Sequence, residues 1–443
     1  MKPQLPLLLM VLAAACAHAP RPAAVTPAEI PGLESQARQR PQDAGVRFRL
    51  AAALAAGRRC DTAIVVARAG LALEPQNVLG PLVVGACQEQ ADRYDAAVAT
   101  YTDFAAAHPR ARGVAALGAK AQLALRAAAE RTARQALARE AALAFDPPQP
   151  ATVAVLPLVI VGDSGVQPLS RGLAELITTD LAYIRTLRLL ERLQIGMLLD
   201  ELKLGESERV DPATAARVGR LLRAERMVQG TATIPPHGLV RLSATVVTGA
   251  GVVRPVGQVT GPFRKLLELE KQVVFDLAAQ LGLALTQVER EQILRQGTKS
   301  LAAFLAYSRG LEALDRADYG AAAREFRAAA QADPSFQAAQ QGQQTAAAAP
   351  AAQQGTGGAL VTLVAAVEQV TTPTQPTGGI ASSGLLSSTT RDVVPTLGDP
   401  ITQAGGLASA ASTIERQPTT ESLGLPSILS VTNGITIIFK RPP

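Results

Sequence analysis

The stretch from Thr152 to Gly282 constrains the fold most, because here the hydrophobic period changes repeatedly between that of a strand and that of a helix. The near-continuous apolar run Thr152–Ile160 is typical of a buried strand, and leucines and isoleucines then recur at helical spacing through Leu169–Ile184. Apolar and polar residues alternate through Val228–Ile234 and Val240–Val246, as in antiparallel strands with one wet face. The whole order predicts an α/β (α+β) domain over residues 150–284, in which helices cover a sheet.

The segments between these patterns complete the domain. Leu187–Glu191 is short and apolar, which predicts a second buried strand, and Glu191 and Arg192 are expected to close it at the surface. Asp211 followed by a proline predicts a helix start. Val252–Thr260 contains a proline and a glycine, so we expect it at an edge of the sheet.

No catalytic, cofactor-binding or metal-binding residues are predicted. Gly162–Gly165 follows a strand and precedes a helix, but it lacks the lysine of a phosphate-binding loop. The histidines, at positions 18, 108 and 237, have no ligand or triad partners at suitable spacing. An enzyme is therefore not expected.

The charge pattern argues against nucleic-acid binding. The formal net charge is +6, but lysine and arginine are interleaved with aspartate and glutamate along helices. The basic residues also lack aromatic interleaving, since only 3% of the chain is aromatic. The charged residues are therefore expected to lie on solvent-exposed faces of helices.

The amino terminus has the pattern of a secretory signal. Lys2 precedes an apolar run that is too short to span a bilayer, and small residues then lead to Cys16. This resembles a bacterial lipobox, in which the cysteine becomes the lipidated first residue, although Leu12 lies one place early. The alternative is cleavage after Ala19, which the following Pro20 disfavours. The prediction is a signal peptide over 1–16, lipid on Cys16, and a Pro- and Ala-rich tether over 17–43.

Internal repeats flank the central domain. Two windows of 34 residues, Ala44–Asn77 and Val78–Ala111, align with small residues where two helices cross and with a closing proline at the same offset. They resemble tetratricopeptide repeats, and residues 44–146 are predicted to form such helices; a generic alanine-rich helical hairpin is the alternative. Residues 300–340 fit the same template, so one more repeat is expected there. A single repeat cannot bury its own faces, so it should dock on the domain's closing helix or on the earlier repeats.

Cys60 and Cys87 are candidates for a disulfide. Cys60 falls near the start of one repeat's second helix and Cys87 near the end of the next repeat's first helix, and antiparallel packing brings these ends together. An exported protein meets an oxidising compartment. The alternative is two buried, reduced cysteines.

The carboxyl-terminal segment changes composition. Residues 341–425 are rich in Ala, Gln, Gly, Thr, Ser and Pro, and we expect this tail to be largely disordered. Within it, Ala359–Val370 is apolar enough for a short helix or strand. Residues 426–443 contain an Asn-Gly pair between two apolar runs, which predicts a β-hairpin that adds to another sheet edge.

Several segments of the central domain resemble the periplasmic domain of CsgG-like lipoproteins and the amino-terminal domain of TolB. They are Val153–Leu158, Gly172–Leu181, Leu190–Arg192, Leu199–Leu202 and Gly230–Thr231. A CsgG-like pore requires two long β-hairpins in each subunit, and a membrane-spanning strand needs about 9–11 residues. The turns Ile234–Leu239 and Thr248–Gly251 are too short to contain such hairpins.

The resemblance implies an outer-membrane lipoprotein that faces the periplasm. We expect a non-enzymatic scaffold that binds other envelope proteins through its repeats and central domain and the membrane through its lipid. The alternative is a subunit of an oligomeric export channel, which would be a homo-oligomer with barrel strands from the tail. No cofactor is expected.

Overall fold

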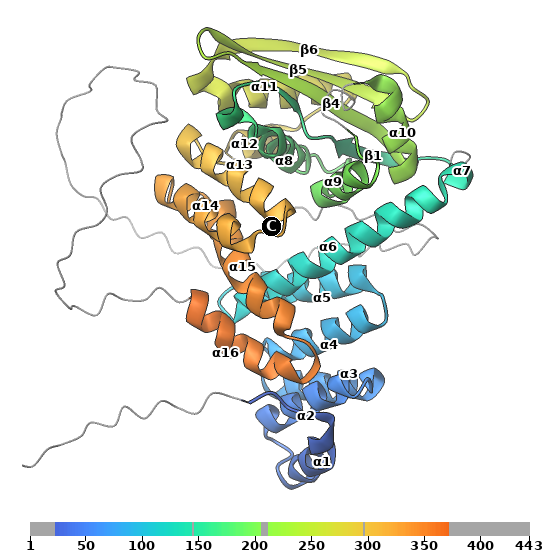
Figure 1. Cartoon of the computed structure of the whole chain (residues 1–443), viewed down its shortest axis with the longest axis vertical. Coiled ribbons are helices and arrows are strands. Elements are labelled where there is room, and N and C mark those ends of the chain that lie inside the picture. Colours follow the sequence, from blue (N-terminus) through green and yellow to red (C-terminus); the bar gives the residue numbers. More distant parts are fainter. Residues whose placement is uncertain (1–22, 144–145, 205–210, 296, 372–443) are drawn as a thin grey trace, which may run out of the picture. The chain divides into compact units, whose positions relative to one another are not determined.

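The computed structural model describes residues 23–143, 146–204, 211–295 and 297–371. Cys16, the signal peptide 1–16 and the hairpin 426–443 lie outside these residues, as does the tail beyond Thr371. The first helices are α1 (Ile30–Gln39), α2 (Ala44–Ala56), α3 (Cys60–Leu73), α4 (Leu79–Gln90), α5 (Tyr94–Ala107), the long α6 (Val114–Ala138) and the short α7 (Glu140–Leu143), with a 3-10 turn η1 (Pro27–Glu29) ahead of them (Figure 1).

The central domain contains a six-stranded sheet whose main path has the order β3-β1-β4-β5-β6. Its elements are β1 (Gln149–Val155), β2 (Val159–Gly162), η2 (Ser164–Val166), α8 (Leu169–Leu181), β3 (Arg188–Leu189), α9 (Arg192–Glu201), α10 (Pro212–Leu222), β4 (Ala224–Ile234), β5 (Leu239–Thr248), β6 (Val253–Pro262), η4 (Phe263–Lys265) and α11 (Leu266–Gln280). β1, β2 and β3 run parallel to their partners, while β4, β5 and β6 form an antiparallel meander. The mixed α/β architecture and the edge position of β6 agree with the sequence patterns.

Helices cover both faces of the sheet. Apolar residues of α8 and α11 pack with Val228, Leu242 and Val246 on one face. On the other face α9 and α10 pack with Met227 and Val247, and the last turns of α6 join this core (Figure 1). Fewer side chains of the meander are therefore exposed to solvent than in an antiparallel sheet with one open face.

The expectation of one continuous strand over Thr152–Ile160 is wrong. The strand breaks at Pro157, which has no N–H to donate. The N–H of Leu156 still donates to the carbonyl of Val228, but the N–H of Leu158 donates to Ser170 instead. β1 and β2 consequently pair with successive parts of β4 as two strands.

The tether predicted over 17–43 is wrong for its second half. Thr26 and Glu29 form a capping box around Pro27 in η1, which starts a helical segment that continues as α1. Ile30 and Leu33 of α1 are buried in the core of the first helices. These apolar anchors give the segment enough burial to order it.

The last described helices are α12 (Gln287–Arg295), α13 (Leu301–Asp315), α14 (Tyr319–Ala332), α15 (Gln337–Gln354), η5 (Gly357–Ala359) and α16 (Leu360–Thr371). The predicted disorder from residue 341 is therefore wrong for α15, which continues to Gln354. Buried alanines of α15, among them Ala346 and Ala348, permit close approach to neighbouring helices, so a composition without large apolar residues still packs. Of the two alternatives for Ala359–Val370, the structure has the helix.

Candidate functional site

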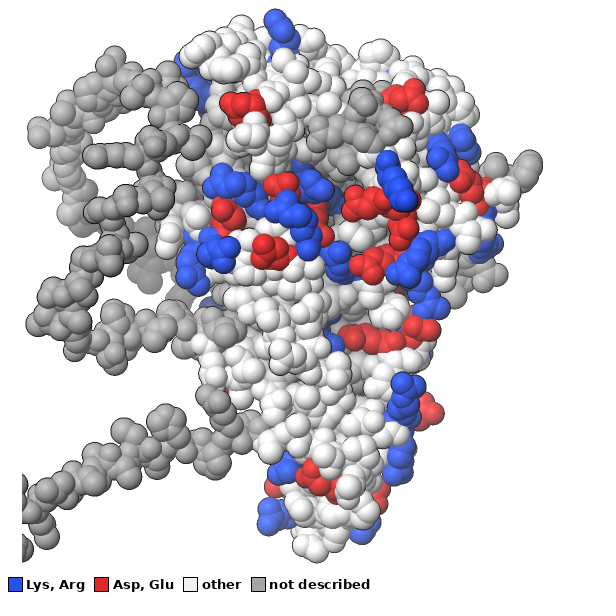
Figure 2. Space-filling model, in the orientation of Figure 1, with Lys and Arg blue, Asp and Glu red and all other residues white. Residues whose placement is uncertain are grey.

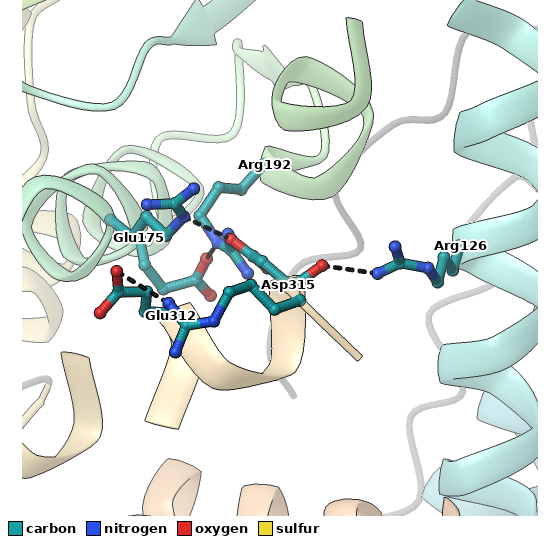
Figure 3. Close-up of polar contacts among 7 residues, drawn as sticks. Arg126, Glu175, Arg192, Glu312 and Asp315 are labelled. Carbon is teal, nitrogen blue, oxygen red and sulfur yellow. Dashed lines mark hydrogen bonds and ion pairs between the residues drawn. The ribbon is translucent and has the colours of Figure 1, made fainter. Parts of the chain in front are cut away.

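Asp315, the last residue of α13, lies where three parts of the chain meet (Figure 3). Its Oδ2 accepts hydrogen bonds from Arg171 Nε of α8 at 2.8 Å and from Arg192 Nη1 of α9 at 2.6 Å. Its backbone carbonyl accepts from Arg126 Nη1 of α6 at 2.7 Å. We call Asp315 and the side chains of Arg126, Arg171, Arg192 and Glu175 the Asp315 junction.

The helix end explains why this position attracts arginines. The last carbonyls of a helix have no intrahelical partner and carry partial negative charge, so a carboxylate at the same end is unfavourable by itself. At Asp315 one arginine satisfies a carbonyl and two others compensate the carboxylate. Removing these arginines would leave a largely buried carboxylate without a counter-charge at the negative end of the helix dipole.

Arg192 is the most buried cation of the junction. Its side chain is 8% exposed, and Nε donates to Glu175 Oε2 at 3.0 Å while Nη1 donates to Asp315. Burial by itself would lower the pKa of the Arg192 guanidinium, but the carboxylates of Asp315 and Glu175 outweigh it and raise that pKa. The prediction that Glu191 and Arg192 close a strand at the surface is therefore wrong for Arg192, which begins α9 and points inward.

Aromatic rings close the junction on the side of α13 and α14. Tyr307 of α13 packs against Phe326 and Phe336 with ring centroids 5.3 and 4.8 Å apart. Burial, and then the nearby Glu175 carboxylate, raises the pKa of the Tyr307 hydroxyl. A belt of mixed charges crosses the face of the molecule at this level, and the middle of the face directly below it is largely uncharged (Figure 2).

The helices on the two sides of the central domain form one continuous array. α15 packs against α14 on one side and α6 on the other, and α16 packs against α2, α4 and α6 (Figure 1). Leu360, Leu363 and Val367 of α16 belong to the same apolar core as the first helices. The central domain is thus inserted between α6 and α13 of this array, and the helical hairpin α13–α14 packs against both α15 of the array and α8 of the domain.

Three helical hairpins of the array share a turn. α2–α3, α4–α5 and α13–α14 each contain one residue with positive φ at the same place, namely Arg58, Asp92 and Ala317, at 57°, 56° and 58°. In the last two hairpins a glycine of the first helix lies against an aromatic ring of the second. These pairs are Gly85 with Tyr101 and Gly310 with Phe326, and an added Cβ would meet either ring. The hairpins are therefore structural repeats of one another.

The structure brings the two predicted disulfide residues together. Cys60 begins α3 and Cys87 lies near the end of α4, as expected, and their sulfur atoms are within bonding distance with Cα atoms 5.4 Å apart. This is the geometry that a disulfide requires. The predicted lipidation site, Cys16, lies outside the described residues. Among the described residues, no group of three or more His, Cys, Asp or Glu side chains could hold a metal ion.

A second polar cluster lies inside the central domain, where α8 and α11 meet. Asp180 and Glu270 are both inaccessible to solvent, and Lys271 forms ion pairs with both carboxylates. Burial raises the pKa of Asp180 to about 6 against the opposing effect of Lys271, and burial and then Asp180 raise the pKa of Glu270 well above its usual value. Two buried carboxylates share one ammonium group, which does not offset their burial, so both pKa values stay above the usual range.

A cavity of about 10 Å³ adjoins this cluster, between the two helices and β4 and β5. It has room for about one water molecule. Glu270 lines it together with Gln229, Ser243 and apolar side chains such as Leu173 and Val273. A space of this size cannot accept an organic ligand.

Comparison with known families gives one match. Residues 157–235 match the family model described as curli production assembly/transport component CsgG. The matched segment begins at the proline that separates β1 from β2 and ends just after β4, so it contains α8, α9 and α10. It therefore includes Arg171, Glu175 and Arg192 of the Asp315 junction. Comparison with curated proteins found no match.

The CsgG-like match agrees with the sequence resemblance over the core of the central domain. The predicted short turns are also present, because four residues separate β4 from β5 and four separate β5 from β6. None of the helices in the described ranges is both long and apolar enough to cross a membrane.

Sequence reasoning missed the Asp315 junction almost entirely. Arg171 and Glu175 lie four residues apart on one helix, a spacing that is also typical of a solvated helix face. Asp315 ends another helix and is followed by Arg316 in an ordinary hairpin turn. One signal was available. A negatively charged aspartate at the carboxyl end of a helix is destabilised by the helix dipole, so a cation is expected nearby. Which cation supplies the compensation depends on tertiary contacts.

Proposed function

We propose that the chain is an envelope lipoprotein that acts as an assembly scaffold. The central observation is that the CsgG-like domain is inserted into one continuous array of helical hairpins and held there by the Asp315 junction. An array of this kind offers extended surface for protein partners. The family description concerns assembly and transport of curli components, which favours an assembly or secretion machine as the setting.

The hairpins act, in this proposal, as tetratricopeptide-like repeats. The shared positive-φ turn and the recurring glycine–aromatic contact support this assignment. Their partners are other envelope proteins. A lipid on Cys16 attaches the chain to the periplasmic face of the outer membrane, and the chain works by binding and not by catalysis.

Quantitative affinity purification tests the scaffold. The tagged chain is cross-linked in a Gram-negative host and its envelope partners are measured for wild type, Asp315→Asn and Glu325→Gln. Glu325 is the matched control, because its carboxylate also pairs with an arginine, Arg309, but lies at the surface. We expect Asp315→Asn to recover less partner and Glu325→Gln to recover the wild-type amount. A protein that recovers no partner above an unrelated lipoprotein would refute the proposal.

The lipid anchor has its own test. Cys16→Ser should abolish acylation, seen as a band shift, and release the chain from membranes washed with 0.5 M NaCl. Unchanged association with the salt-washed membranes would exclude Cys16 as the anchor.

A subunit of an oligomeric export channel is the second candidate, because the family description includes transport. A channel subunit should form heat-resistant rings in detergent and resist extraction without strong detergent. A scaffold should become extractable by 0.5 M NaCl, without detergent, once Cys16 is replaced. The short β4–β5 and β5–β6 turns favour the scaffold.

The Cys60–Cys87 pair is proposed to be oxidised after export. Its closeness in the structure supports this. Non-reduced peptide mass spectrometry of protein from the periplasm decides it, and two free thiols would refute the bond.

A further inference from the structure

The chain enters its fold at Val25, which is packed tightly in place. Val25 is buried, and its N–H donates to the carbonyl of Gly358 in η5 at 3.2 Å. An added Cβ at Gly358 would collide with the backbone of Val25, so only glycine permits this close approach. The chain is thus fixed beside α2 and η5 from its third described residue onward.

This entry point limits how far the fold can lie from a lipid on Cys16. Eight residues separate Cys16 from Val25. A fully extended chain spans at most about 3.4 Å per residue, so Val25 lies within roughly 30 Å of the acylated cysteine. The surface around α1 and the α2–α3 turn is therefore close to the membrane if the proposed anchor is correct, and the inference rests on that part of the proposed function.

Arginines surround this end of the molecule. Residues 23–59 contain six arginines and three acidic residues. The α2–α3 turn lies beside the entry point, since an added Cβ on Gly57 would be 3.6 Å from Pro27 Cβ. Figure 2 shows basic side chains on both sides of the lower end, where Figure 1 places α1 and α2. We call Arg38, Arg40 and Arg58, which are all exposed, the arginine end.

The acidic residues of this segment are already engaged. Glu29 pairs with Arg49 at 3.6 Å, and Glu34 pairs with Arg59 at 4.0 Å. Asp43 caps α2 by accepting from the N–H of Val46.

The arginine end itself has no such compensation. Among the described residues, Arg38, Arg40 and Arg58 form no ion pair with a carboxylate, and the adjacent η5 carries no charge. Asp61, in the first turn of α3, is the nearest further acid in the sequence, and the helix dipole already favours it there.

We propose that the arginine end binds the head groups of anionic phospholipids in the membrane that carries the anchor. A guanidinium group matches a phosphate with two parallel hydrogen bonds. A basic side chain near an anionic surface strengthens binding by about fivefold, so three of them are worth about 100-fold. The contact orients the fold, with α1 and α2 towards the lipid and the CsgG-like domain away from it.

Vesicle flotation tests this without any acyl chain. Unacylated protein spanning residues 17–443 is mixed with phosphatidylethanolamine vesicles containing either 30% phosphatidylglycerol or the same amount of phosphatidylcholine. The variant is Arg38→Gln/Arg40→Gln/Arg58→Gln. The matched control replaces three arginines of the central domain, on β5, β6 and η4: Arg241→Gln/Arg254→Gln/Arg264→Gln. Circular dichroism checks that both variants fold.

We expect wild type and control to float with the anionic vesicles and to be released by 0.5 M NaCl, because salt screens the attraction. The variant should bind them about 100-fold more weakly. Equal binding by variant and wild type, or equal binding to both kinds of vesicle, would overturn the proposal. Neither outcome bears on acylation, which the band shift of Cys16→Ser measures independently, so the two proposals fail separately.

Discussion

Replacing Glu270 by glutamine should change how the stability of the central domain depends on pH. Glu270 and Asp180 are buried together with only Lys271 to balance them, and neither Glu270 oxygen has a hydrogen-bond partner among the described residues. Both carboxyl groups have raised pKa values, with burial as the largest cause. The unfolded chain therefore releases these protons near pH 4, while the folded chain still holds them, so stability falls as pH rises from about 4 to the folded pKa values.

The magnitude follows from the Asp180 shift. A rise of its pKa from 3.8 to about 6 corresponds to about 3 kcal/mol of unfolding free energy, lost between about pH 4 and pH 7. Glutamine keeps the shape of Glu270 and carries no titrating proton, and Lys271 then neutralises Asp180 alone. We expect Glu270→Gln to leave stability nearly unchanged at pH 4 and to raise it by about 1–3 kcal/mol at pH 8.

Urea unfolding followed by far-ultraviolet circular dichroism at pH 4 and pH 8 measures this difference. Glu268→Gln is the matched control, because Glu268 lies on the same helix with its side chain 66% exposed and pairs with Lys265 at the surface. It should have the wild-type pH dependence. If Glu270→Gln had the wild-type pH dependence too, or were less stable than wild type at pH 8, the raised pKa of Glu270 would not be a source of the pH dependence.

Three further predictions concern the array and its junction. Gly85→Ala should lower the thermal unfolding midpoint, since the added methyl group collides with the ring of Tyr101 and overpacking costs about 1–3 kcal/mol. Asp315→Asn should cost about 2 kcal/mol, because Arg192 keeps only one carboxylate partner in a buried site, and hydrogen exchange should rise in α13 and α14. Reducing the proposed Cys60–Cys87 bond should lower stability by about 3–4 kcal/mol for its 27-residue separation, measured by urea unfolding with and without reductant.

Each of these has a control. Gly196→Ala, on a helix with open space at the added methyl group, should not destabilise, because alanine is the better helix former. Equal losses at Gly85 and Gly196 would show that the collision with Tyr101 is not the cause. Unchanged exchange in α13 after Asp315→Asn would mean that the junction does not hold the hairpin. Reductant should have no effect on a Cys60→Ser/Cys87→Ser variant.

Patterns within single elements were predicted well from the sequence. The alternation through β4 and β5, the apolar stripe of α8 and the N-cap Asp211 of α10 are all local signals, and the structure contains each of these elements where expected. The 34-residue repeat also placed Cys60 and Cys87 at helix ends that meet, because the offset of a repeat defines which ends are neighbours.

Signals that depend on packing were misread. The alanine- and glutamine-rich α15 has the composition of a disordered tail, but its small side chains pack closely against α14 and α6. Arg192 has the sequence context of a surface residue. It can be buried because Asp315 of α13 supplies a carboxylate that compensates its charge.

The sequence by itself therefore determined the elements: the mixed domain, its CsgG-like core and the helical hairpins before and after it. Tertiary structure alone decided that these hairpins form one array, that the domain is inserted into it, and that Asp315 joins them. The physical reason is the distance along the chain over which each kind of interaction acts. Hydrophobic period, caps and turns act over a few residues, whereas the contacts of Asp315 join positions 123 to 189 residues apart in the chain.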